Sequence, residues 1–98
     1  MAWTALARML PKKIRQLGLE QVWHFSLFKG QWDKIIEQAV GVKFVGRSRP
    51  AKLTNGALIV DCLNSVWANE LRLREGRILE EIRRSGAKIT VSKISFIS

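Results

Sequence analysis

The fold is decided by residues 49–71, whose sequence is RPAKLTNGALIVDCLNSVWANEL. Asn55-Gly56 lies between two strand-like runs, and both residue types tolerate the positive φ angles of a type I′ turn. Residues 47–63 are therefore predicted to form a β-hairpin. An Asn-Ser pair follows directly and offers side-chain oxygens to the free N–H groups of a helix start, where the apolar period changes from 2 to 3.6.

The other predicted elements extend outward from this hairpin and its helix. Apolar spacings of three and four residues predict helices over residues 2–17, about 20–45 and about 65–84, and the long helix could kink near Gly30. Residues 87–97 are predicted to form a last strand. Its apolar phase slips near Lys93, which predicts a bulge or twist there.

Two features of the hairpin predict how it sits in the sheet. Pro50 cannot donate a ladder hydrogen bond, so the first strand is expected at an edge. In the second strand, Leu58, Val60 and Cys62 lie on one face and Ile59 and Asp61 on the other, and the first set should face the helices.

Length and element order together predict an α+β fold. The 98 residues provide material for one hydrophobic core, so residues 1–98 are expected to form a single domain. Two N-terminal helices, a hairpin, a helix and a strand give a three-stranded mixed sheet with helices on one face. Small KH-like domains are built this way, although the sequence contains no Gly-x-x-Gly clamp for nucleic acid.

Charge is the strongest indication of function in the composition. The chain has 17 Lys and Arg against 8 Asp and Glu, a net charge of +9 and a pI near 10.7. Such a surface attracts polyanions, of which nucleic acid is the commonest inside a cell. The alternative is a basic protein whose charge serves solubility. Arginine suits phosphate contacts, and the candidate nucleic-acid-binding residues are Arg47, Arg49 and Lys52 on the hairpin with Arg72, Arg74 and Arg77 on the following helix.

Signals for catalysis, metals and cofactors are missing from the sequence. There is no Ser-His-Asp set, no recognisable carboxylate pair and no metal-ligand spacing around His24. Gly41 and Gly46 have a G-x-x-x-x-G spacing, but Arg47 follows where a Walker motif requires Lys. We therefore expect a non-enzymatic protein with no cofactor, metal or small-molecule substrate.

Location is inferred from the cysteine and from the first residues. Cys62 is the one cysteine and has no partner for an intrachain disulfide, so we expect a buried small side chain. The apolar N-terminal run is interrupted by Arg8 and by the basic residues at 12 and 13, before a signal-peptide core or membrane span could form. A cytoplasmic protein without membrane contact is expected.

One set of residues carries a resemblance to a known family. The set comprises Trp32, Val40-Gly41, Phe44-Val45, Ser48-Arg49-Pro50, Lys52-Leu53, Asn55-Gly56, Leu58, Val60 and the segment Ser65-Val-Trp67-Ala68-Asn-Glu70-Leu71. Across about residues 10–97, this pattern resembles the DciA family of bacterial replicative helicase loaders. The resemblance implies a KH-like domain that binds DNA and acts on the ring-shaped replicative helicase.

Three functions remain open from sequence. The leading hypothesis is a DNA-binding accessory or loader of the replicative helicase that contacts single-stranded or duplex DNA. One alternative is a KH-like RNA-binding protein, because the 2′-hydroxyl contact that distinguishes RNA from DNA leaves no signature in composition. The other alternative is a protein-interaction domain with an acidic partner. Trp67, Ala68 and Leu71 are interpreted as residues that seat the helix on the sheet.

Overall fold

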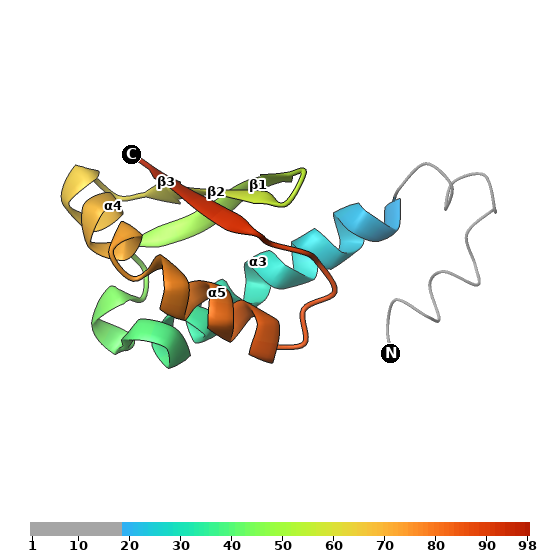
Figure 1. Ribbon diagram of the computed structural model, residues 1–98, viewed down its shortest axis with the longest axis horizontal. Helices are drawn as coiled ribbons and strands as arrows, with labels where there is room; N and C mark the ends of the chain where they lie inside the picture. Colours follow the sequence, from blue (N-terminus) through green and yellow to red (C-terminus); the bar gives the residue numbers. More distant parts are fainter. Residues whose placement is uncertain (1–18) are drawn as a thin grey trace.

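The computed structural model describes residues 19–98 and shows a sheet covered on one face by helices (Figure 1). The predicted helix over residues 2–17 lies outside the described residues. The elements are, in chain order, α3 (Leu19–Val40), the 3₁₀ helix η1 (Val42–Phe44), β1 (Ser48–Thr54), β2 (Ala57–Cys62), α4 (Ser65–Arg72), α5 (Glu75–Arg84) and β3 (Lys93–Ile97). The predicted α+β class is confirmed.

The sheet has the predicted mixed topology. Its strand order is β1-β2-β3, with β1 antiparallel to β2 and β3 parallel to β2. Pro50 lies in β1, which is an edge strand as predicted. The strand irregularity falls in β1, where the register with β2 shifts between Pro50 and Lys52.

The hairpin turn has the predicted backbone. Asn55 has φ 50° and Gly56 has φ 82°, and the flanking Thr54 and Ala57 are paired in register. The Gly56 carbonyl also accepts hydrogen bonds from the backbone N–H groups of Ser92 (2.8 Å) and Lys93 (3.3 Å). The turn therefore closes the hairpin and also fixes the start of β3.

The long helix is shorter than predicted. It continues through Gly30 but ends at Val40 rather than near residue 45. Gly41 follows with φ 115° and ψ 161°, a conformation that is essentially restricted to glycine. A glycine in this conformation stops the helix, and η1 then carries Phe44 into the core.

The single helix predicted over residues 65–84 is two helices. Arg74 leaves helical geometry with φ −112° and ψ 16°, between α4 and α5. The carboxylate of Glu75 accepts a hydrogen bond from the Ile94 N–H (2.9 Å), which ties the start of α5 to β3. The predicted order of two N-terminal helices and then a hairpin is also wrong for the described residues, because one α-helix precedes the hairpin and two follow it.

The last strand starts later than predicted, which explains the phase slip. Residues 87–92 form an irregular connection, and β3 begins at Lys93, where a bulge had been predicted. Ile94 and Phe96 alternate inward within β3, whereas Val91 is buried from the connection. The two apolar phases therefore belong to two different backbone conformations.

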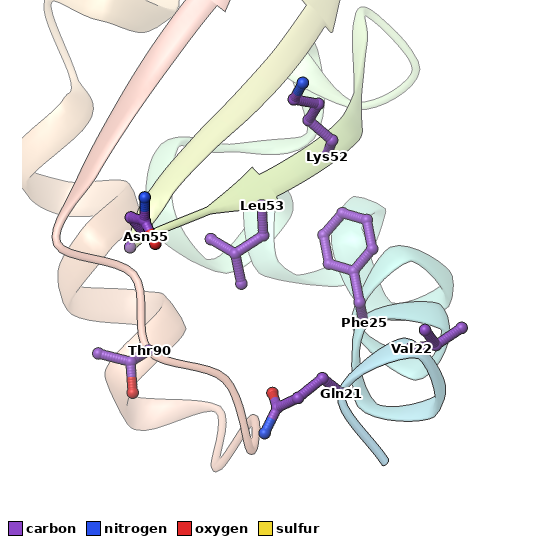
Figure 2. A pocket seen from close by; sticks show the side chains of 8 residues that line it. Gln21, Val22, Phe25, Lys52, Leu53, Asn55 and Thr90 are labelled. Atoms are coloured by element: carbon purple, nitrogen blue, oxygen red, sulfur yellow. The ribbon is translucent and has the colours of Figure 1, made fainter. Parts of the chain in front are cut away.

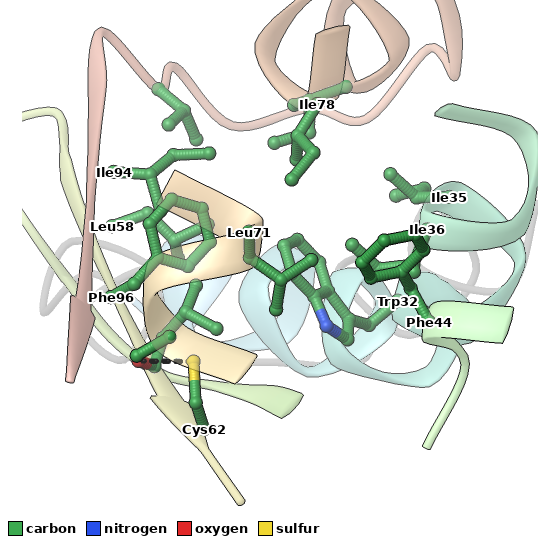
Figure 3. Packing of buried hydrophobic residues seen from close by; sticks show 14 of the residues in the cluster. Trp32, Ile35, Ile36, Phe44, Leu58, Cys62, Leu71, Ile78, Ile94 and Phe96 are labelled. Carbon is green, nitrogen blue, oxygen red and sulfur yellow. Dashed lines mark hydrogen bonds between the residues drawn. The ribbon is translucent and has the colours of Figure 1, made fainter. Parts of the chain in front are cut away.

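The core lies between the sheet and the helices (Figure 3). Leu58, Val60 and Cys62 are buried as predicted, whereas Asp61 is exposed on the open face of β2. On the sheet side, β3 adds Ile94 and Phe96 beside Leu58 and Val60. The helices supply most of the opposing apolar surface, through Phe28, Trp32, Ile35, Ile36, Ala68, Leu71, Ile78 and Ile82. Within residues 19–98, no helix is long and apolar enough to cross a membrane.

Replacement of Gly56 by Ala tests the importance of the turn. The new Cβ would lie 2.8 Å from the Ser92 hydroxyl oxygen and would stand on a residue with φ +82°. An L-residue in the left-handed region costs roughly 1–2 kcal/mol, so the free energy of unfolding in urea should fall by about that amount. Gly30→Ala is the control, because its Cβ meets nothing within 4 Å in α3 and should stabilise by about 0.5–1 kcal/mol. Equal effects of the two variants would contradict this role of the turn.

Candidate nucleic-acid interface

Two arginines and two aromatic rings meet where η1 faces α4. The rings of Phe44 and Trp67 make an edge-to-face contact with centroids 5.6 Å apart and an interplanar angle of 84°. The Arg47 guanidinium carbon lies 4.9 Å from the Trp67 ring centroid, and that of Arg74 lies 4.7 Å from the Phe44 centroid. These distances are within the range of cation–π attraction. We call Arg47, Trp67, Phe44 and Arg74 the cation–aromatic cluster.

Local hydrogen bonds place the Arg47 side of this cluster. The Asn64 side chain accepts from the Trp67 N–H (3.1 Å) and caps α4, as the sequence predicted. The Leu63 N–H donates to the Arg47 carbonyl (2.8 Å), which holds the chain before β1 against the end of β2. The Trp32 indole N–H donates to the Ser48 hydroxyl (3.1 Å) and anchors the first residue of β1 on α3.

Arg74 is held more tightly than Arg47. Its Nη1 donates to the Glu70 carbonyl oxygen (2.7 Å) and to the Glu70 carboxylate (3.0 Å). Arg47 is exposed and touches the Trp67 ring. The charge of Arg74 is therefore largely compensated by Glu70, whereas Arg47 can still offer its donors to an anion.

Arg49 and Arg72 lie at the same end of the molecule. Arg47 and Arg49 line a shallow hollow of about 360 Å³ beside Asp61 and Cys62, and Arg49 is the register partner of Asp61. Arg72 donates to the Asn69 side-chain oxygen and to the Phe96 carbonyl, both at 3.4 Å. We call Arg47, Arg49, Arg72 and Arg74 the basic end.

Lys52 and Arg77 line hollows other than the one that Arg47 and Arg49 line. Lys52 lines a pocket of about 480 Å³ between α3 and the hairpin turn, beside Phe25 and Leu53 (Figure 2). Arg77 lines a small hollow of about 150 Å³ with Gln38 of α3 and with Glu80 and Glu81 of α5. The structure thus gathers four of the six candidate residues at the basic end and places the other two in different hollows.

Sequence reasoning missed the two residues of η1 that complete the site. The Arg74 guanidinium stacks on the Phe44 ring, and the Lys43 ammonium lies 5.9 Å from the centroid of the same ring. Residues 42–44 were predicted as part of a helix, which gave no reason to place them against α4. The basic residue next to the aromatic was the one available signal.

The described residues contain no arrangement that suggests catalysis. Within residues 19–98, no group of three His, Cys, Asp or Glu side chains is placed to hold a metal ion. Cys62 is buried, and its thiol faces the Val60 carbonyl oxygen at 3.8 Å. Burial raises the pKa of the Cys62 thiol, Asp61 raises it further, and Arg72 partly opposes both. A thiol of this kind stays protonated near neutral pH and is a poor nucleophile.

The raised pKa of Cys62 predicts slow alkylation of the native protein. Thiolate is the reactive form, so iodoacetamide at pH 8 should modify native Cys62 at least about tenfold more slowly than the same chain in urea. The alkylation rate increases as the thiol loses its proton. This increase should occur at a higher pH in the native protein than in urea, because folding favours the protonated thiol. Mass spectrometry of the alkylated chain measures both rates. Equal rates in the two states would contradict a buried thiol.

Fold and site together define a small basic α+β domain whose distinctive feature is a cluster of arginines stacked on aromatic rings. The family model described as "Dna[CI] antecedent, DciA" matches residues 5–96, and the chain belongs to the DciA family. This family is associated with helicase loading and interacts with the replicative helicase, which supports a replication-related accessory role for the chain. No curated protein and no solved structure matches the chain.

Proposed function

We propose that this chain is a non-enzymatic, DNA-binding accessory of the replicative helicase, and that DNA contacts its basic end. The observation that carries the proposal is the gathering of four arginines at one end, two of them stacked on Trp67 and Phe44. Guanidinium groups suit phosphate because their planar fork presents several donors at once. Stacking on a ring restricts the side chain beforehand, which lowers the entropy lost on binding.

The arginines of the basic end are assigned unequal roles. Arg47 and Arg49 are exposed and line the same hollow, so we assign them the first phosphate contacts. Arg72 donates to neutral acceptors, and its charge adds to the same field. Arg74 is paired with Glu70 and serves mainly to hold Phe44. Lys52 lies further along β1, where it would add a phosphate contact for a DNA strand that follows the hairpin. Arg77 lies outside the path of this DNA strand.

A KH-like architecture is part of the proposal. An antiparallel hairpin, a third strand added in parallel after two helices, and helices on one face support it. KH domains clamp the nucleic-acid backbone with a Gly-x-x-Gly loop. Here the junction between α4 and α5 reads Leu73-Arg74-Glu75-Gly76, so binding would depend on charge at the basic end.

Salt-dependent binding tests the proposal. Fluorescence anisotropy should measure the affinity of the chain for labelled single-stranded DNA, duplex DNA and matched RNA across a series of NaCl concentrations. Each phosphate contact on a single strand contributes a slope of about −0.7 to log K against log salt. The Arg47→Ala/Arg49→Ala variant should therefore flatten the slope by about 1.4 if both residues contact phosphate.

The control variant is Arg83→Ala/Arg84→Ala, which removes the same charge from the exposed end of α5. It should change affinity less and leave most of the slope in place. An equal loss in both variants would show that net charge, and not the basic end, determines binding. Preference for RNA would favour the RNA-binding alternative, and no binding at low salt would exclude the nucleic-acid function.

A further inference from the structure

Aliphatic side chains are exposed on the outer face of α4 and at the residue just before its N-cap. Leu63 is 64% exposed, Val66 67% and Leu73 74%. We propose that these three residues, which we call the α4 ridge, form a docking surface for a protein partner. The partner surface would be an apolar patch with carboxylates at its edge.

Helix geometry places the ridge away from the core. The inner face of α4 is formed by Ala68 and Leu71, which are buried, and by the half-buried Trp67. Val66 and Leu73 are seven residues apart, so two helical turns put them on one side, roughly opposite this inner face. Leu73 still has helical dihedral angles, so this geometry extends to it. Figure 1 shows α4 at one end of the molecule, with the sheet and α5 on its inner side.

The charges beside the ridge indicate an acidic partner. Asn69 lies on the same outer face, and its side-chain oxygen accepts from Arg72. The second acceptor of Arg72 is the Phe96 carbonyl, so both of its hydrogen-bond partners are neutral. On the other flank, the carboxylate of Glu70 is paired with Arg74 at 3.0 Å. The ridge is therefore bordered by an uncompensated positive charge, which complements carboxylates.

Nucleic acid does not suit the ridge itself. Bases are bound by aromatic or guanidinium planes and phosphates by cations, whereas Leu and Val offer neither. Burial of aliphatic surface against another apolar surface is favourable by about 25 cal/mol per Å². Since the ridge adjoins the basic end without including its arginines, protein and DNA could be bound by neighbouring surfaces of one domain.

The inference rests on the proposed function in one respect, because the replicative helicase is taken as the partner. The probe is the purified hexameric helicase of the same organism, titrated with the full chain by biolayer interferometry. The ridge variant is Val66→Gln/Leu73→Gln, which leaves Leu63 unchanged because that residue also lines the hollow of Arg47 and Arg49. The control is Val22→Gln/Leu27→Gln, which changes the same residue types at exposed positions of α3.

The ridge variant should weaken helicase binding at least about tenfold, as expected when central aliphatic contacts are lost. The control variant should bind within about twofold of the unmodified chain. Both variants should keep their circular dichroism spectrum and the DNA salt slope, which shows that the ridge variant is folded. Helicase binding that is unchanged in the ridge variant, or equally weakened in the control, would overturn the inference.

A charge-reversal pair tests the acidic character of the partner. Arg72→Glu should weaken helicase binding at least about tenfold, whereas Arg83→Glu on α5 should not. Equal helicase affinity of these two variants would overturn the inference that the partner surface is acidic. If the unmodified chain binds DNA but not the helicase, the ridge inference fails and the DNA function stands. If the chain binds the helicase through the ridge but does not bind DNA, the ridge inference stands and the DNA function fails.

Discussion

The two-residue turn at Asn55-Gly56 is the constraint on which the rest of the structure depends. Both residues have positive φ, and this geometry sets the register of β1 against β2. The Gly56 carbonyl then accepts the N–H groups of Ser92 and Lys93, which fixes where the parallel strand β3 begins. One turn thus determines an antiparallel and a parallel pairing. A side chain at Gly56 would meet the Ser92 hydroxyl, so the close approach of the two segments requires glycine.

The basic end is built at the end of the hairpin opposite the Asn55-Gly56 turn, where β2 leads into α4. β2 ends at Cys62, and α4 begins within three residues, capped by Asn64. The short connection holds Trp67 beside the chain that enters β1, where Arg47 stacks on the ring. Gly41 ends α3 and lets η1 bring Phe44 against the same Trp67. Arginines far apart in sequence gather because two aromatic rings support them at the junction of helix, turn and strand.

The features predicted correctly from sequence are those that depend only on neighbouring residues in the chain. The Asn-Gly turn, the edge position of Pro50, the Asn64 cap and the inward face of β2 were all predicted, since each depends on a few adjacent residues. The break between α4 and α5 was not predicted, because no Gly or Pro stands at residues 73 and 74 and the apolar period continues across them. That break accompanies tertiary contacts, namely Glu75 with the Ile94 N–H and Arg74 with Phe44. For the same reason, charge alone could not separate Lys52 and Arg77 from the basic end.

Under the proposed function, the pairing of each charged side chain should matter more than the net charge of the chain. Arg74 is compensated by Glu70 and stacks on Phe44, so its main effect is to position an aromatic ring. Arg47 stacks on Trp67 and remains exposed, and Arg72 bonds to neutral oxygens, so both keep charge that a partner can neutralise. The aliphatic α4 ridge begins beside these arginines, where apolar and cationic surfaces adjoin. Surfaces of these two kinds favour different ligands, because aliphatic burial rewards an apolar partner and counterion release rewards a polyanion. Two chemically distinct surfaces therefore adjoin where α4 lies beside the residues that enter β1.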